Sequence, residues 1–191
     1  MEDLSETGFT TREYTWHIKD GTEAKLSRYR LSDNYLRFYL RYIEPNRKRI
    51  VAGLFTGLPA GWLSILGLQF ENLVLSNRQK LRELLQIPPE EIIYDNAYFQ
   101  TQTAGRKGCQ IDYLVQTKYG ALYVGEVKFK QGLIDTSVIE EVKEKIASLD
   151  RPKWSSCRPV LIHVNGVTDS VIESDFFAHI IDFSQFLESN G

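Results

Sequence analysis

The sequence predicts an α/β (α+β) fold in which a mixed β-sheet is flanked by helices. Residues 109–117 and 121–129 are typical of two β-strands, and Gly120 between them can take the positive φ that a tight turn needs. Residues 137–149 then form the pattern of an amphipathic helix, and residues 158–165 that of a buried strand. A strand, a long helix and a strand in this order favour a parallel crossover beside the central hairpin.

Length and composition indicate one globular domain, or one domain with a small appendage. The chain has 191 residues, 42% of them hydrophobic, and a net charge of −2, which argues against a general polyanion-binding protein but leaves a local basic patch open. The two cysteines have no C-x-x-C spacing, which argues against a structural zinc site and indicates a cytoplasmic location. We expect no signal peptide and no membrane span, because the first residues are acidic and the apolar stretch 51–68 is interrupted by Gly, Pro and Ser.

Residues 1–31 are predicted to form a β-hairpin, with Tyr14, Trp16 and Ile18 alternating along its first strand. A hairpin of this length cannot bury its own aromatic side chains. We therefore expect it to pack on the helix that follows, or on elements outside this sequence.

A basic segment follows the hairpin. Its helix is expected to begin at Ser32 or Asp33 and to end at Glu44-Pro-Asn. Residues 25–49 hold eight Lys and Arg against two Asp and Glu, a charge of +6. This is either an ordinary solvated surface or a surface for phosphates. The candidate nucleic-acid contacts within it are Arg47, Lys48 and Arg49.

Residues 50–61 contain three Gly and one Pro and are a candidate domain boundary. A single amphipathic helix is predicted over residues 62–85. Glu71 lies on the apolar stripe of this helix, where its side chain is either exposed at the edge or paired with Arg78.

The next segment, residues 91–102, is predicted to form a core strand. The polar turn that follows carries Arg106 and Lys107, which either contact a backbone phosphate or are simply exposed. A short strand at 176–182 and a helix at 183–187 are expected to end the fold. The charges of the helix at 137–149 are expected on a solvated face, namely Glu140, Glu141, Lys143, Glu144 and Lys145.

Three charged residues fall on the central hairpin, where both faces of the sheet are otherwise apolar. Strand alternation places Glu126 and Lys128 on one face, and the hairpin can bring Asp112 close to them. Two carboxylates suit a hard cation such as Mg²⁺, and a neighbouring lysine can hold or deprotonate an attacking water. The alternative is that the three charges are solvated and pair with one another.

The arrangement of Asp112 followed by Glu126-Val-Lys128 resembles the D…E-x-K signature of the PD-(D/E)xK nuclease superfamily, which has a restriction endonuclease-like fold. Longer segments at 29–39, 67–71 and 125–129 resemble the C-terminal domain, of unknown function, of a family of archaeal and bacterial AAA-type ATPases. In that family an ATPase module and a winged helix precede the nuclease-like domain. The resemblance covers nearly the whole chain from about residue 8 onward.

The resemblance implies a restriction endonuclease-like core with a sheet of four to five strands in residues 50–191. Residues 1–49 would then be an extension, the remnant of a winged helix. The sequence has no G-x-x-x-x-G-K-[ST] motif and hence no ATP site, so the ATPase module would act in cis, outside this sequence, or in trans. The sequence also leaves open whether the chain forms a homo-oligomer.

The resemblance also implies hydrolysis of DNA phosphodiesters. Asp112, Glu126 and the backbone carbonyl of Val127 would hold Mg²⁺ or Mn²⁺. Lys128 would position or activate the water. Glu71 stands where the resembling nucleases have a helix glutamate that reaches the metal site.

Two other functions fit the same sequence. The first is a catalytically silent DNA-binding or regulatory domain, in which Glu126 and Lys128 pair with each other or with Arg106. The second is an adaptor that binds another protein through the hairpin, and a large exposed apolar patch where the missing winged-helix elements should pack would distinguish it.

Overall fold

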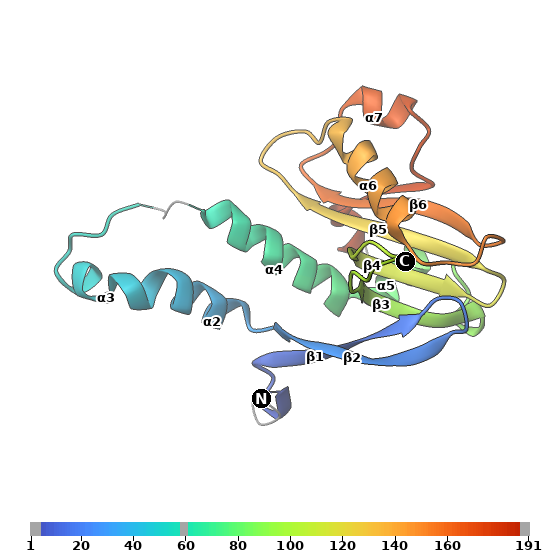
Figure 1. Ribbon diagram of the computed structural model, residues 1–191. Helices are drawn as coiled ribbons and strands as arrows, with labels where there is room; N and C mark the ends of the chain where they lie inside the picture. Colours follow the sequence, from blue (N-terminus) through green and yellow to red (C-terminus); the bar gives the residue numbers. More distant parts are fainter. Residues whose placement is uncertain (1–4, 58–60, 188–191) are drawn as a thin grey trace.

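The centre of the computed structural model, which describes residues 5–57 and 61–187, is a five-stranded sheet in the order β3-β4-β5-β6-β7 (Figure 1). Its strands are β3 (Ile92–Gln100), β4 (Cys109–Thr117), β5 (Ala121–Phe129), β6 (Ser156–Val164) and β7 (His179–Asp182). The first three strands pair antiparallel, whereas β5-β6 and β6-β7 are parallel. The predicted mixed sheet, with a parallel crossover through α6 (Ser137–Ser148), is therefore confirmed.

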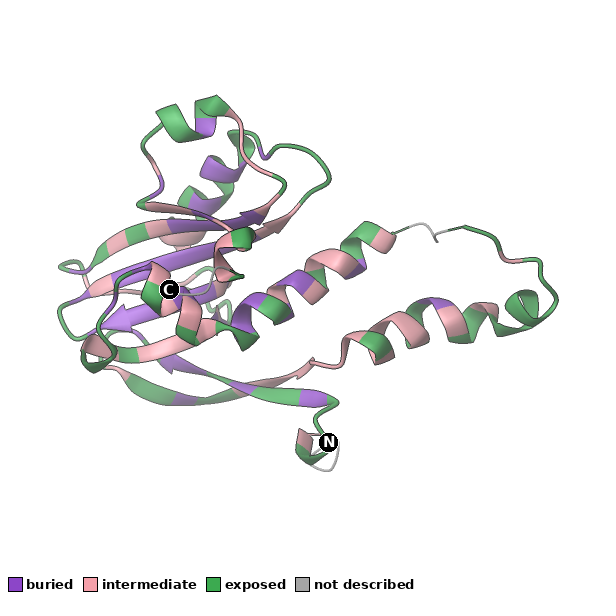
Figure 2. Ribbon diagram, turned by 180° about the vertical axis from the view of Figure 1, so that it is seen from behind, coloured by how far each residue is buried: buried purple, intermediate pink, exposed green. Residues whose placement is uncertain are grey.

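Helices cover both faces of this sheet, and the strands between them are largely buried (Figure 2). On one face lie α4 (Trp62–Ser76), α5 (Arg78–Leu84) and the short 3₁₀ helix η3 (Phe183–Phe186). On the other face α6 and α7 (Asp169–Glu173) cover the β5-β6 side, and α7 was not predicted. In the part of the chain that the structure describes, no helix is long and apolar enough to cross a membrane.

The N-terminal hairpin packs on the open part of the second face. It consists of β1 (Thr10–His17) and β2 (Thr22–Leu31). Trp16 stacks on Tyr94 with ring centroids 5.0 Å apart, and its Nε1–H donates to Oε1 of Gln116 at 2.7 Å. The expected partner of the hairpin was wrong, because the central sheet itself buries Trp16. Tyr14 is 40% exposed, since a register shift between Tyr14 and Trp16 breaks the strict alternation of faces.

Lys25, Arg28 and Arg30 of the basic segment lie on β2, and the residues that follow form a helical arm that projects away from the sheet (Figure 1). Its elements are α2 (Asn34–Phe38), the π-helical turn η1 (Tyr39–Ile43) and α3 (Glu44–Val51). The expected helix end at 44–46 was wrong. Pro45 lies in the first turn of α3, where its missing N–H removes no bond that a regular helix needs.

The single helix expected over 62–85 is divided at Asn77, which ends α4 and precedes α5. Ser76 Oγ donates to the carbonyl of Asn72 at 2.8 Å, and Asn77 Nδ2 donates to that of Leu73 at 2.7 Å. Side chains that bond to carbonyls four residues back compete with the helical ladder and favour a bend. A 3₁₀ turn, η2 (Pro89–Glu91), then leads into β3.

Candidate functional site

β4 and β5 separate at the end of the sheet where the predicted charged residues lie. The last of their registered pairs in the described part of the chain is Tyr113 with Gly125. Beyond it, the backbone N–H of Val127 donates to Oδ2 of Asp112 at 3.0 Å. The gap between the strands thus holds a carboxylate in place of a strand partner.

A β-bulge determines where Asp112 points. The register between β3 and β4 shifts so that Ala97 alone faces both Asp112 and Tyr113. Ile111 therefore packs in the layer of Leu114, and not in that of Tyr113 as strict alternation predicts. Bulges re-aim side chains in this way. Asp112 as a result lines two cavities, one towards α6 and one towards α4.

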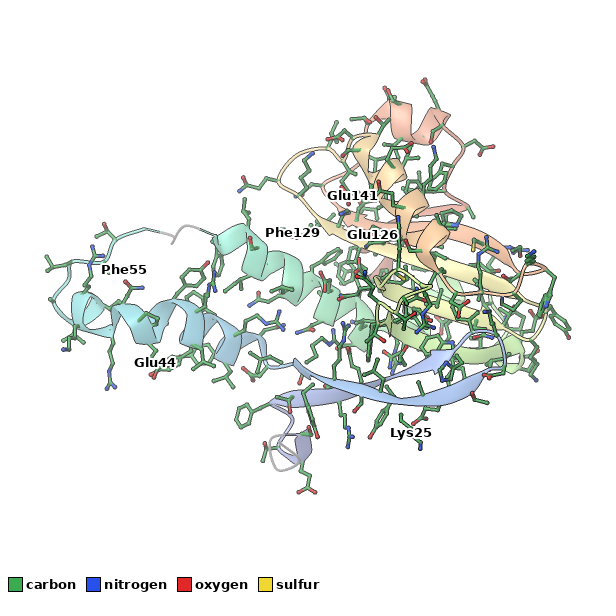
Figure 3. The ribbon with its side chains drawn as sticks, in the orientation of Figure 1. Lys25, Glu44, Phe55, Glu126, Phe129 and Glu141 are labelled. Atoms are coloured by element: carbon green, nitrogen blue, oxygen red, sulfur yellow. The ribbon has the colours of Figure 1, made fainter. Side chains whose placement is uncertain are left out.

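On the α6 side, two lysines and two glutamates form a chain of ion pairs. Lys128 Nζ lies 3.0 Å from Oε1 of Glu126 and 2.5 Å from Oε2 of Glu141. Lys145 Nζ contacts the other carboxylate oxygen of Glu126 and lies 3.9 Å from Oδ1 of Asp112. Figure 3 shows Glu126 on β5 beside Glu141 on α6. The structure thus brings Asp112, Glu126 and Lys128 to one place, as expected.

The prediction that all charges of α6 are solvated was wrong for Lys145, whose side chain is 26% exposed and contacts Glu126, whereas Glu141 is 50% exposed although it pairs with Lys128. The two residues are four apart and so lie on the same helix face, next to the buried Val138 and Val142. That spacing was the available signal. It was not decisive, because the same pattern occurs on ordinary solvated helices.

Glu71 reaches the site from α4. It lines a cavity of about 300 Å³ together with Asp112, Arg30 and Arg37. The alternative pairing with Arg78 was wrong, because the guanidinium of Arg78 donates to the backbone carbonyl of Asp95 at 2.8 Å. Three carboxyl groups from α4, β4 and β5 therefore gather at the strand gap.

Burial and the charge of neighbouring carboxylates disfavour the ionised forms of Glu71 and Asp112. Burial, and then the charge of Asp112, raises the pKa of Glu71 to about 7. Burial, and then the charge of Glu126, raises the pKa of Asp112 to about 6. Burial alone would lower the pKa of Lys128, but the carboxylates of Glu141 and Glu126 outweigh burial and raise it. Lys128 is therefore a cation at neutral pH, which suits a donor to water or phosphate better than a general base.

The raised pKa of Glu71 predicts a specific dependence of stability on pH. In the folded protein Glu71 keeps its proton up to about pH 7, whereas in the unfolded chain it loses the proton near 4.5. Between these two pH values the folded state binds more protons than the unfolded state, so Glu71 lowers the free energy of unfolding as pH rises from the lower value to the higher. Between pH 5 and pH 8, the free energy of unfolding of Glu71→Gln should rise by about 1–3 kcal/mol relative to that of wild type. This range follows from about 1.36 kcal/mol per pKa unit, reduced because Glu71 is partly exposed to solvent.

Urea unfolding in EDTA at the two pH values measures this difference. Glu83→Gln, an exposed change on α5, is the matched control and should show no such gain. An equal response of the two variants would contradict the environment assigned to Glu71.

The residues present fit a hard divalent cation. No group of three or more His, Cys, Asp or Glu side chains that could hold a metal occurs within residues 5–57 and 61–187. Mg²⁺, however, is commonly bound by one or two carboxylates and keeps water and phosphate oxygens in its other positions. The ammonium group of Lys145, in contact with Glu126 and near Asp112, shows that this place favours positive charge.

The predicted basic contacts lie away from the strand gap. Arg106 lines a separate cavity with Lys107 and pairs with Asp150, with Nη1 3.3 Å from Oδ2. Arg47, Lys48 and Arg49 are exposed on α3, in the projecting arm of Figure 1. Arg30 and Arg37, which were not singled out, are the arginines that line the cavity of Glu71 and Asp112.

The chain shows limited similarity to known proteins. No protein-family model matches the chain. An uncharacterized protein of Methanocaldococcus jannaschii, MJECL04, is 30% identical over 90 residues, which is 46% of this chain and 20% of that protein. The crystal structure of a repair endonuclease from Pyrococcus abyssi aligns over 68% of this chain and 49% of that chain, with 14% identity and a TM-score of 0.37. The chain thus spans about a fifth of its curated relative, and membership of the ATPase family stays a prediction.

Proposed function

We propose that this protein hydrolyses DNA phosphodiesters with the help of a bound Mg²⁺ or Mn²⁺ ion. The observation that carries the proposal is the meeting of Glu71, Asp112, Glu126 and Lys128 where β4 and β5 separate. Burying several like charges at a sheet end costs stability, and such arrangements cluster at functional sites.

Each residue has a distinct role in this proposal. Asp112 and Glu126 hold the metal, with the backbone carbonyl of Val127 as a further ligand. The metal, when bound, stabilises the charge that develops on the phosphate. Lys128, a cation beside Glu126, donates to the attacking water or to a phosphate oxygen and so fixes their relative position. Glu71, whose pKa is about 7, holds or releases a proton close to Asp112 at neutral pH.

Calorimetric titration with Mg²⁺ and with Mn²⁺, combined with plasmid nicking by the same samples, tests the proposal. Wild type should bind metal and nick the plasmid, and Asp112→Asn should lose both activities. The matched control is Asp169→Asn, an exposed change on α7, which should behave as wild type. Absence of metal binding by wild type would overturn the catalytic proposal.

A second function, a silent DNA-binding or regulatory domain, is favoured by one observation. Glu126 contacts both Lys128 and Lys145, so its charge is neutralised without a metal. In that case the wild type binds no metal, and Asp112→Asn differs from it only in stability. The module of an AAA-type ATPase, in cis or in trans, is the partner that the sequence resemblance proposes for either function.

A further inference from the structure

An arginine-lined cavity adjoins the proposed catalytic carboxylates on the side away from α6. It has a volume of about 300 Å³, which is at the lower end of the range of ligand pockets. Three arginines line it, Arg28 and Arg30 from β2 and Arg37 from α2, and its wall includes Glu71 and Asp112. The N-terminal hairpin and the first helix of the arm therefore contribute directly to the surroundings of the site.

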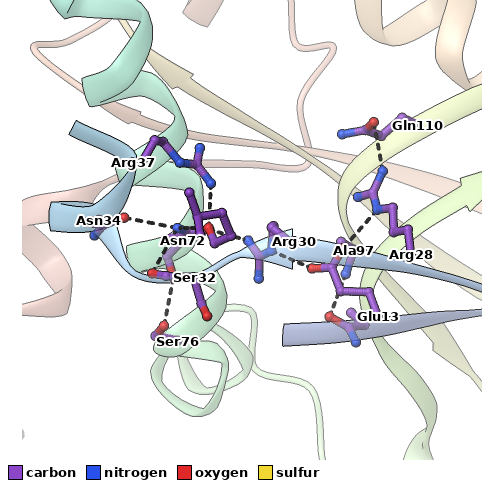
Figure 4. A network of polar contacts seen from close by, with 12 residues as sticks. Glu13, Arg28, Arg30, Ser32, Asn34, Arg37, Asn72, Ser76, Ala97 and Gln110 are labelled. Atoms are coloured by element: carbon purple, nitrogen blue, oxygen red, sulfur yellow. Dashed lines mark hydrogen bonds and ion pairs between the residues drawn. The ribbon is translucent and has the colours of Figure 1, made fainter. Parts of the chain in front are cut away.

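A buried carboxylate fixes two of these arginines (Figure 4). Glu13 is 1% exposed, and its two oxygens lie 2.9 Å from Nε of Arg28 and 2.7 Å from Nε of Arg30. Beyond Glu13, Arg30 Nη1 donates to Oδ1 of Asn72 at 2.7 Å, and Arg28 Nη1 donates to Oε1 of Gln110 at 3.0 Å. These contacts hold both guanidinium groups in place before any ligand arrives, which reduces the entropy lost on binding.

Arg37 is held differently. Its Nη2 donates to the backbone carbonyl of Leu31 at 2.5 Å, and it forms no ion pair within the described residues. The group is half-buried, and burial lowers its pKa while the charge of Glu71 opposes that effect. The lining of the cavity thus holds three arginines against two carboxyl groups, Glu71 and Asp112, and among the described residues Arg37 is the one of the three arginines that forms no ion pair.

Guanidinium groups in a fixed position match the oxygens of a phosphate, which they bind through paired hydrogen bonds. We propose that Arg30 and Arg37, with Arg28 beside them, form a subsite for a DNA backbone phosphate next to the phosphate that reacts at Asp112 and Glu126. The identity of the ligand as DNA rests on the proposed function. The subsite itself rests on the cavity and on the Glu13 network.

The test measures DNA binding without cleavage, so that it is independent of catalysis. Fluorescence anisotropy in EDTA follows the affinity of wild type, Arg37→Gln and Lys118→Gln for a labelled DNA duplex over a range of salt concentrations. Arg37 is chosen because it lies outside the Glu13 network, and thermal unfolding verifies that its variant folds. Lys118 is the control, an exposed cation in the turn between β4 and β5, at the end of these strands opposite the strand gap.

We expect Arg37→Gln to weaken binding by about tenfold or more, the effect of losing one hydrogen-bonded charge. The slope of log affinity against log salt should fall in magnitude by about 0.9, the value for one phosphate contact. Arg37→Lys should recover the slope but not the full affinity, because lysine keeps the charge and lacks the planar fork. Lys118→Gln should match wild type.

Three outcomes overturn the inference: no DNA binding by wild type in EDTA, equal affinities of Arg37→Gln and wild type, or equal losses in Arg37→Gln and Lys118→Gln. Tighter binding of an RNA duplex of the same sequence would overturn the choice of DNA. Asp112→Asn distinguishes this subsite from the catalytic proposal, since it should lose nicking and still bind the duplex in EDTA.

Discussion

Replacing Lys128 with methionine is expected to slow plasmid nicking by about 100- to 10,000-fold, the usual contribution of a positioned proton donor or acceptor. The physical reason is the place of its ammonium group, which lies 3.0 Å from Glu126 at the strand gap and is a cation at neutral pH. Methionine keeps the apolar length of the side chain but removes the charge and the donor. Calorimetry on the same variant should still show metal binding, because Asp112 and Glu126 remain.

The matched control is Lys130→Met. Lys130 is two residues further along the chain, is 53% exposed and pairs with Asp135 at 2.8 Å. Its variant should nick at the wild-type rate. If Lys128→Met loses metal binding together with nicking, then Lys128 acts in assembling the site, and unchanged nicking would remove it from the mechanism altogether.

Replacing Glu13 with alanine should lower the free energy of unfolding by about 3 kcal/mol, the lower end of the range for breaking a buried ion pair. Glu13 is 1% exposed and is the carboxylate that both Arg28 and Arg30 contact. Without Glu13, the two partly buried guanidinium groups lose the anion between them and keep only their neutral partners, Gln110 and Asn72. Those groups keep 31% and 21% of their side-chain surface exposed, so solvent offsets part of the loss.

Urea unfolding at neutral pH measures this effect, and Glu23→Ala on β2 is the control. Glu23 is exposed, so its replacement should change the free energy of unfolding by less than about 0.5 kcal/mol. A loss below about 1 kcal/mol for Glu13→Ala would show that Asn72 and Gln110 already satisfy the two arginines.

Local patterns were sufficient for the central elements of the fold. The strands β4 and β5 occupy the residues predicted for them, because apolar alternation and a turn glycine act within a few residues of each other. The parallel crossover also followed from the order of strand, helix and strand. Errors arose where a residue suits two different positions, as Pro45 does, because proline commonly follows the end of a helix and also suits the first turn of one, its place in α3.

Only some of the residues of the site could be predicted from the sequence. Asp112, Glu126 and Lys128 are close in sequence, and their convergence needs only a hairpin. Lys145 and Arg37 come from elements distant from Asp112 in the sequence and line separate cavities that Asp112 joins, so their identity as site residues depends on how α6 and α2 pack. The bulge at Asp112 likewise requires the pairing of β4 with β3, which neither strand encodes alone.

The sequence by itself thus determined the mixed sheet, the hairpin with its acidic and basic residues, and the presence of Glu71 on the preceding helix. Only the tertiary structure decided that the N-terminal hairpin packs on the sheet and presents arginines next to Asp112, and that α6 supplies Lys145 and Glu141. The reason is the range of the interactions. Alternation and turns act between neighbours, whereas buried charges find their partners through packing across the whole domain.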